Sequence, residues 1–295
     1  MNEHALLLGK SQPVVGIVTE PSRLPPADRA VAVILSNSGI VHRVGPSCAY
    51  VRIARGLAAE GIVTARIDHR GIGDSAPRTD TRQFHDAAVA ELREVMDDLG
   101  DRWGIRRFVI GGICLGASLG FQTASVDDRV RGVVMINGVG HSDDREWNQH
   151  ARDRSAAQQY LKGAVHHRDS WRRVLTGKTN YRLLANRLIT QAKSAAFRSR
   201  KISRIAKEQY SRFSALTARG VHLLWIHSAD DVTIGFRDAI LGRQRARLEA
   251  SGILRSVVVS DADHTFTLLS NQETLLATIR DWMNTWNTWN GGNRV

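Results

Sequence analysis

The stretch at residues 107–120 reads RFVIGGICLGASLG and limits the possible folds more than any other part of the chain. An apolar run leads into two glycines, then Ile113 and Cys114, and the small residues that follow can begin a helix. The glycines at positions 112 and 116 flank the cysteine where a Cβ would collide with a neighbouring segment in a sharp turn. The pattern therefore predicts a strand, a tight turn that carries a reactive thiol, and a helix.

Two other interpretations of Cys114 remain open from these residues alone. A free cysteine beside a strand is commonly an inert part of the core. A glycine-rich nucleotide loop is the other possibility, but it fits poorly because the G-x-G-x-x-G spacing is absent and the segment does not follow a first strand. The choice depends on the rest of the chain.

Apolar runs and helical periodicity alternate along most of the sequence. Short apolar runs predict strands at residues 14–19, 31–35, 62–67, 108–110, 131–137, 221–227 and 256–259. Apolar positions at helical spacing predict helices at residues 50–59, 84–99, 236–251 and 273–286. This alternation predicts an α/β protein with a mostly parallel sheet and helices on both faces.

The alternation stops at residues 141–220, which contain no convincing strand and read as several basic helices. This segment has 18 Lys plus Arg and 6 Asp plus Glu, whereas the rest of the chain has 23 of each sign. We therefore predict a core made of residues 1–140 and 221–295 with a basic helical insertion at 141–220. The excess charge suits an acidic partner or an anionic ligand; alternatively, it only keeps helices solvated.

The composition excludes several protein classes. No apolar run is long enough to span a bilayer, and the first residues lack a basic leader followed by an apolar stretch. The two cysteines do not form a disulfide framework pattern, so a reducing cytoplasm is the expected location. Zinc spacing, a Walker loop and nucleic-acid motifs are absent from the sequence, so no metal, cofactor or nucleic acid is expected.

Two later loops supply the groups that a nucleophilic thiol needs. Asp230 and Asp231 follow the strand at 221–227, and His264 follows the last strand. Open α/β sheets place ligand sites at the carboxyl ends of their strands. A thiol needs a base, and the base needs a carboxylate to orient it, so the order Cys, Asp, His is chemically coherent.

With these residues in this order, the chain resembles the α/β-hydrolases, and the resemblance covers nearly all of its length outside the insertion. The resemblance implies an α/β-hydrolase fold in which Cys114, Asp231 and His264 form the catalytic triad, with Cys in place of the usual Ser. Asp231 is preferred to Asp230 because the family acid usually stands three residues after a small residue, here Ser228. The D-x-R-G-x-G-x-S motif at residues 68–75 resembles the serine aminopeptidase and lysophospholipase-like members, and residues 37–46 are similar to the exosortase A system-associated hydrolases.

The same resemblance implies an oxyanion hole built from backbone N–H groups. One donor would be Leu115, just after the nucleophile, and the other would be Ile40 in the loop after an early strand. Many members carry His-Gly in that loop, whereas this chain has Ser38 and Gly39.

The residues beside these donors are candidates for substrate binding: Ser38, Gly39, His42 and Arg43. His42 is either a ligand contact or a loop-packing residue. Arg43 either binds an anionic group or braces the loop.

These residues predict a hydrolase that cleaves an ester or thioester through an acyl-enzyme on Cys114. The helix N-terminus and the nearby His264 both favour the thiolate, and a thioester donor reaches a thioester intermediate at little thermodynamic cost. The insertion occupies the place of the family lid, where a basic surface suits CoA or an acidic acyl carrier protein. Its aromatic residues either line the acyl pocket or pack the lid itself: Trp147, Tyr160, Trp171 and Tyr181.

Two other functions remain possible from the sequence. One is an acyltransferase that moves the acyl group to an amine or alcohol through the same intermediate. The other is a non-catalytic binding protein that uses its basic segment. Some dienelactone hydrolases also carry Cys in a G-x-C-x-G turn, but they lack a comparable insertion, so their substrate is not carried over.

Overall fold

A computed structural model describes residues 1–24, 26, 30–138, 149, 201–229 and 231–289. The elements along the chain are β1 (Asn2–Leu8), β2 (Val14–Glu20), β3 (Val31–Leu35), η1 (Pro46–Cys48), α1 (Ala49–Ala59), β4 (Val63–Asp68), α2 (Phe84–Trp103), β5 (Arg107–Ile113), α3 (Leu115–Val126), β6 (Val130–Ile136), β7 (His222–Ser228), α7 (Thr233–Leu241), α8 (Gln244–Ala250), β8 (Leu254–Val259) and α9 (Leu269–Trp289). Residues 201–218 are also helical.

The strands form one eight-stranded sheet in the order β1-β2-β4-β3-β5-β6-β7-β8. β2 pairs antiparallel with β1 and β4, and every pair from β4 through β8 is parallel. The predicted mostly parallel sheet is therefore confirmed. Its parallel strands bring the loops after β3, β5, β6, β7 and β8 to one edge, which is where such sheets place their ligand sites.

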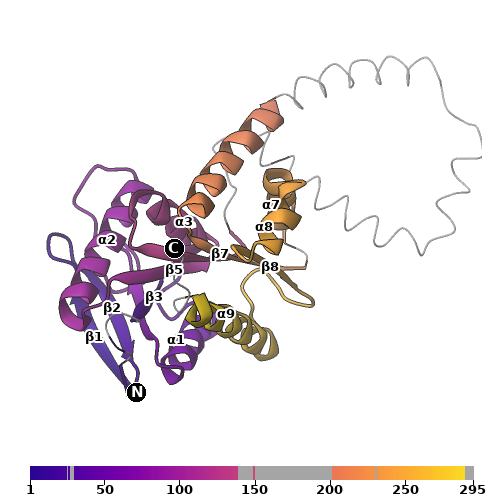
Figure 1. The fold of residues 1–295 in the computed structure, drawn as a ribbon. Helices are drawn as coiled ribbons and strands as arrows, with labels where there is room; N and C mark the ends of the chain where they lie inside the picture. Colours follow the sequence, from indigo (N-terminus) through magenta and orange to yellow (C-terminus); the bar gives the residue numbers. More distant parts are fainter. Residues whose placement is uncertain (25, 27–29, 139–148, 150–200, 230, 290–295) are drawn as a thin grey trace, which may run out of the picture. The chain divides into compact units, whose positions relative to one another are not determined.

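Helices cover both faces of the sheet, as predicted. α1 and α9 pack together on one face, and α2 and α3 pack together on the other (Figure 1). β5 is buried between α3 on one face and the core that includes residues of α1 on the other, which explains its apolar run. The core between the sheet and α1 and α9 is built from large apolar side chains, among them Val33, Leu35, Ile53, Leu57, Val109, Ile136, Leu224, Leu275, Ile279 and Trp282.

Two elements differ from the sequence-based expectation. β1 is absent from the predicted strands because it is an edge strand with exposed polar positions, and it is anchored by ion pairs of Glu3 with Arg55 (2.6 Å) and Arg66 (2.9 Å). The single helix predicted at 236–251 is two helices, α7 and α8. They are separated at Gly242, whose φ of 47° lies in the left-handed region and interrupts the helix.

The chain divides into two compact units. One contains residues 1–139, 213–231 and 243–295, and the other contains 140–212 and 232–242. Most of the predicted insertion at 141–220 lies outside the described residues, and so do Trp147, Tyr160, Trp171 and Tyr181. Within the first unit, Phe213 stacks on Trp225 of β7 with ring centroids 5.0 Å apart.

Candidate active site

Cys114 occupies a strained turn between β5 and α3. Its φ of 55° and ψ of −104° lie outside the regions that ordinary residues prefer, and it is the N-cap of α3. A Cβ on Gly112 would lie 2.7 Å from the carbonyl oxygen of Ser36, and one on Gly116 would lie 2.5 Å from the same atom. The two glycines of the motif are therefore required by close contact with the neighbouring segment.

His264 connects the cysteine to a buried carboxylate. Its Nδ1 lies 2.5 Å from Oδ2 of Asp231, and the Asp231 side chain is 4% exposed. The hydrogen bond with Asp231, followed by the hydrogen bond with Cys114, raises the pKa of His264 to about 10. The structure thus brings together three side chains from the loops after β5, β7 and β8. Asp230 lies outside the described residues.

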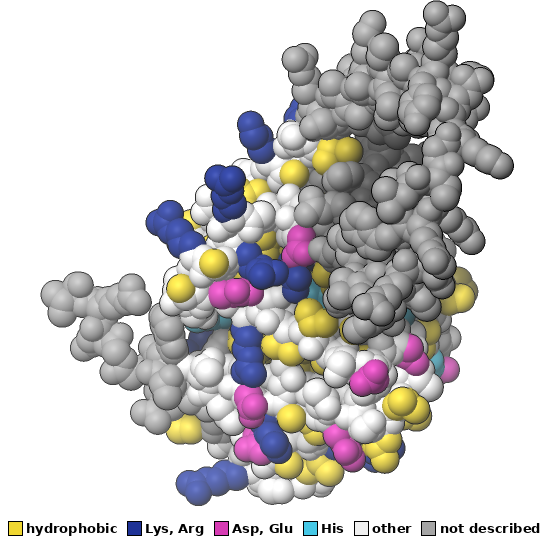
Figure 2. Space-filling view, turned by 90° about the vertical axis from the view of Figure 1, so that its right-hand side faces the viewer, with side chains coloured by type: hydrophobic (Ala, Val, Ile, Leu, Met, Phe, Trp, Pro, Cys, Tyr) yellow, Lys and Arg dark blue, Asp and Glu magenta, His cyan; other side chains and the backbone are white. Residues whose placement is uncertain are grey.

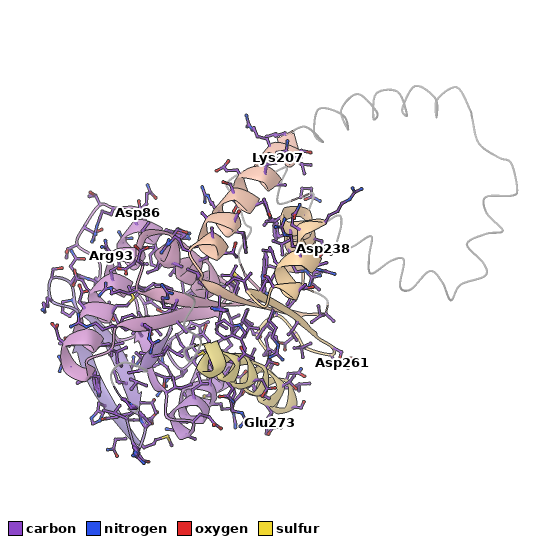
Figure 3. The ribbon with its side chains drawn as sticks, in the orientation of Figure 1. Asp86, Arg93, Lys207, Asp238, Asp261 and Glu273 are labelled. Atoms are coloured by element: carbon purple, nitrogen blue, oxygen red, sulfur yellow. The ribbon has the colours of Figure 1, made fainter. Side chains whose placement is uncertain are left out.

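Asn137, just after β6, joins the two loops that carry Asp231 and His264. It has a φ of 43°, and its amide Nδ2 donates to Oγ of Ser228 (3.0 Å) and to the carbonyl oxygen of His264 (2.8 Å). Its Oδ1 accepts from the N–H of Ser228 at 2.8 Å. The His264 loop begins after Val259, the last residue of β8, and includes Asp261, which is labelled in Figure 3.

The two expected backbone donors lie in the loops after β3 and β5. Leu115 is the first residue of α3, where N–H groups have no partner within the helix. Ile40 lies in a turn closed by a hydrogen bond from the N–H of Val41 to the carbonyl of Ser38 (3.1 Å), and its side chain is exposed. Ser38 is buried, and Gly39 has a φ of 60°, in the left-handed region that favours glycine.

Comparisons with known proteins identify the fold family of the chain. A family model described as alpha/beta hydrolase fold matches residues 37–231, which is more than half of the chain. The chain belongs to this family. The observed sheet, with helices on both faces, is accordingly an α/β-hydrolase fold. None of the curated proteins compared matches the sequence.

Several solved structures are similar in fold to this chain at low sequence identity. Proline iminopeptidase from Mycobacterium smegmatis is 16% identical, with 96% of this chain and 98% of that chain covered and a TM-score of 0.55. The esterase PF2001 from Pyrococcus furiosus is 12% identical, with 97% and 91% covered and a TM-score of 0.54. Dienelactone hydrolase from Anabaena variabilis is 14% identical, with 96% and 97% covered and a TM-score of 0.52.

In this α/β-hydrolase, Arg43 and His42 take part in an ion-pair cluster of the protein itself. Nη1 of Arg43 contacts Oδ2 of Asp68 at 2.5 Å and Oδ2 of Asp74 at 2.7 Å, and it donates to Nε2 of His42 at 2.8 Å. The backbone N–H of Arg43 also donates to Asp68 at 2.6 Å. This arrangement matches the bracing role considered for Arg43.

The same cluster also contains potential metal ligands. Atoms of His42, Asp68 and Asp74 lie within 4.8 Å of one another. The guanidinium of Arg43 already lies between the two carboxylates, so its positive charge disfavours a cation there. Within the described residues, the ion pairs of the cluster join the loop after β3 to Asp68 at the end of β4 and to Asp74 in the loop after it.

The sequence reasoning did not find several residues that support the site. Tyr50 is fully buried, and its hydroxyl oxygen accepts the N–H of Ile113 at 2.7 Å, directly before the cysteine. Asn137 directly follows β6 and Asn37 lies two residues after β3, and a short polar residue at the carboxyl end of a strand is the signal that marks both. Among the described residues of this hydrolase, no helix is long and apolar enough to cross a membrane.

Proposed function

We propose that the chain is a hydrolase that cleaves an ester or thioester bond through a covalent acyl-enzyme on Cys114. The observation that carries this proposal is that His264 hydrogen-bonds both Asp231 and Cys114 at the strained turn after β5. The motif at residues 68–75 supports a relationship to the serine aminopeptidase and lysophospholipase-like members, and residues 37–46 support one to the exosortase A system-associated hydrolases.

The first half-reaction transfers the acyl group to sulfur. With a pKa of about 10, His264 carries its extra proton at neutral pH, and this favours a thiolate–imidazolium pair with Cys114. The thiolate attacks the acyl carbonyl carbon, and the carbonyl oxygen becomes an oxyanion that the N–H groups of Leu115 and Ile40 stabilise. The tetrahedral intermediate then expels the alcohol or thiol, which takes its proton from His264.

The second half-reaction releases the acyl group to water. Neutral His264 accepts a proton from water, the hydroxide attacks the thioester carbonyl, and the Cys114 sulfur leaves as the thiolate. Asp231 orients the imidazole and stabilises its charge throughout. A thioester donor exchanges one thioester for another in the first step, so acyl-CoA and acyl carrier protein thioesters are the favoured substrates, used in a reducing cytoplasm.

Steady-state kinetics on matched donors test this function. The same short acyl group would be offered as an N-acetylcysteamine thioester and as an ethyl ester, with free thiol or acid as the measured product. Wild type should prefer the thioester, and Cys114→Ala should lose at least 100-fold in kcat/KM. Cys48→Ser is the matched control because Cys48 is the other free cysteine and is exposed. Equal rates for Cys114→Ala and wild type would refute the proposal, whereas consumption only after an amine or alcohol is added would indicate acyl transfer.

A further inference from the structure

A second network of hydrogen-bonded side chains is buried in the protein and is centred on His69. Nε2 of His69 lies 2.8 Å from Oγ of Ser36, and its Nδ1 lies 2.7 Å from Oε2 of Glu91. The side chains of His69 and Glu91 are 0% and 3% exposed, and Ser36 is fully buried. A substrate cannot reach these buried groups, so this network of side chains does not form a second nucleophilic site.

His69 also holds the next residue of the loop after β3. Its backbone N–H donates to Oδ1 of Asn37 at 2.8 Å. Nδ2 of Asn37 in turn donates to the carbonyl of Val41 at 2.8 Å, which secures the turn that contains Ile40. One histidine therefore contacts two consecutive residues of the loop that presents the expected backbone donor.

Ser36 is the point where this loop crosses the turn of the nucleophile. Its N–H donates to the carbonyl of Gly111 at 3.0 Å. Its own carbonyl lies so close to Gly112 and Gly116 that neither position can accept a Cβ without a shift. The position of Ser36 thus sets the distance between the Ile40 loop and Cys114.

We propose that His69, oriented by Glu91, is a positioning residue that fixes the backbone donor of Ile40 relative to Cys114 through Ser36 and Asn37. The inference rests on the proposed function, because a donor matters only where an oxyanion forms. Oxyanion stabilisation requires donors preorganised at hydrogen-bond distance from the developing charge. A small displacement of the loop therefore lowers the rate of acyl transfer to sulfur without changing the thiolate itself.

Two reactions of the same thiol separate positioning from general damage. Acylation by an N-acetylcysteamine thioester forms an oxyanion, whereas alkylation by iodoacetamide displaces iodide at a saturated carbon and forms none. Both rates would be measured in a Cys48→Ser background, so that only Cys114 reacts. We expect Ser36→Ala to acylate at least 10-fold more slowly than the parent and to be alkylated within twofold of the parent rate.

Two further variants show whether a slower acylation in Ser36→Ala comes from the position of the Ile40 loop. Glu91→Gln keeps an oxygen that can accept the Nδ1–H of His69 and should retain most of the acylation rate. Asn137→Ala loosens the His264 loop instead and should lower both rates together. If Ser36→Ala does not fold, His69→Asn makes the same test, because it keeps a donor towards Glu91 and loses the contact with Ser36.

The outcomes distinguish this inference from the proposed function. Unchanged acylation in Ser36→Ala, or an equal loss of acylation and alkylation, would overturn the positioning role while the function stands. Alkylation without any acylation in the parent protein would overturn the proposed function and this inference with it.

Discussion

At the scale of single residues, the chemistry of the site depends on where the proton of the Cys114–His264 pair resides. The hydrogen bond of Nδ1 with the Asp231 carboxylate, whose side chain is 4% exposed, favours the imidazolium form of His264, and the hydrogen bond with Cys114 adds to this preference. A thiol is acidic enough to release its proton to such a histidine, whereas an alcohol is not. The pair therefore suits sulfur better than oxygen, although most members of the family use serine.

Replacing the sulfur by oxygen tests this preference. We expect Cys114→Ser to hydrolyse a short thioester at least 100-fold more slowly than wild type, because a hydroxyl is far less acidic than a thiol and does not form a resting ion pair with His264. The measurement is kcat/KM together with the melting temperature, which should stay close to that of wild type. A serine variant within tenfold of wild type would argue against the thiolate–imidazolium pair.

The raised pKa of His264 also predicts a pH-dependent stability. The value is about 6.5 in an unfolded chain and about 10 in the fold, so protonation stabilises the folded state. This stabilisation is fully present below about pH 6.5 and disappears as the pH rises to about 10. Its size is limited by solvent screening, because the imidazole is 46% exposed. The difference in urea midpoint between wild type and His264→Gln should therefore shrink from pH 6.5 to pH 10; a constant difference would contradict the assignment.

At the scale of elements, the site depends on loops that parallel strands bring to one edge. Asn137 is central to this edge because its side chain links the start of the Asp231 loop, at Ser228, with the His264 loop. Its left-handed backbone turns the chain out of the sheet directly after β6. The acid and the base are therefore held by one buried amide as well as by their own hydrogen bond.

Removing that amide should uncouple the two loops. We expect Asn137→Ala to lower thioester hydrolysis about 10- to 100-fold and to destabilise the fold by about 1–3 kcal/mol, the usual cost of leaving buried polar groups unpaired. Arg93→Ala is a suitable control, since Arg93 lies on α2, has a side chain that is 53% exposed and makes a surface ion pair with Asp127 (Figure 3). Wild-type kinetics and stability in Asn137→Ala would exclude the linking role.

The elements also show what the sequence can and cannot reveal. The α/β alternation and the order Cys114, Asp231, His264 are readable because periodicity and strand ends are local signals. The support behind them is not local: Ser36 and His69 are 33 residues apart, and Asn137 and Ser228 are 91 residues apart. Such pairs meet only through the strand order of the sheet. The break at Gly242 escaped prediction because the flanking residues are compatible with a continuous helix.

At the scale of the whole molecule, charge is distributed unevenly along the chain. Residues 141–220 carry 18 basic and 6 acidic residues, and the rest of the chain is balanced. On the face shown in Figure 2, the lysine and arginine side chains that the structure describes stand among acidic and apolar ones. The basic segment is thus the part of the sequence best suited to the phosphates of CoA or to an acidic carrier protein.

Raising the ionic strength should lower kcat/KM for a charged acyl donor more than for a neutral one. If the basic segment attracts the donor, kcat/KM for an acyl-CoA should fall at least severalfold between about 50 and 500 mM NaCl, because salt screens exposed charges beyond a few ångströms. The N-acetylcysteamine thioester of the same acyl group is uncharged and should be nearly insensitive to salt. Parallel salt dependences for the two donors would remove CoA and carrier proteins as favoured partners of the segment.

Cys114 should carry an acyl group during turnover, and intact-mass spectrometry measures this directly. The protein would be mixed with a butyryl thioester and quenched in acid at short times, beside Cys114→Ala, Cys48→Ser and His264→Ala. We expect a transient butyryl adduct on wild type and Cys48→Ser, a much slower one on His264→Ala and none on Cys114→Ala. An adduct that forms on Cys114→Ala, or its absence from wild type while product accumulates, would contradict an acyl-enzyme on Cys114.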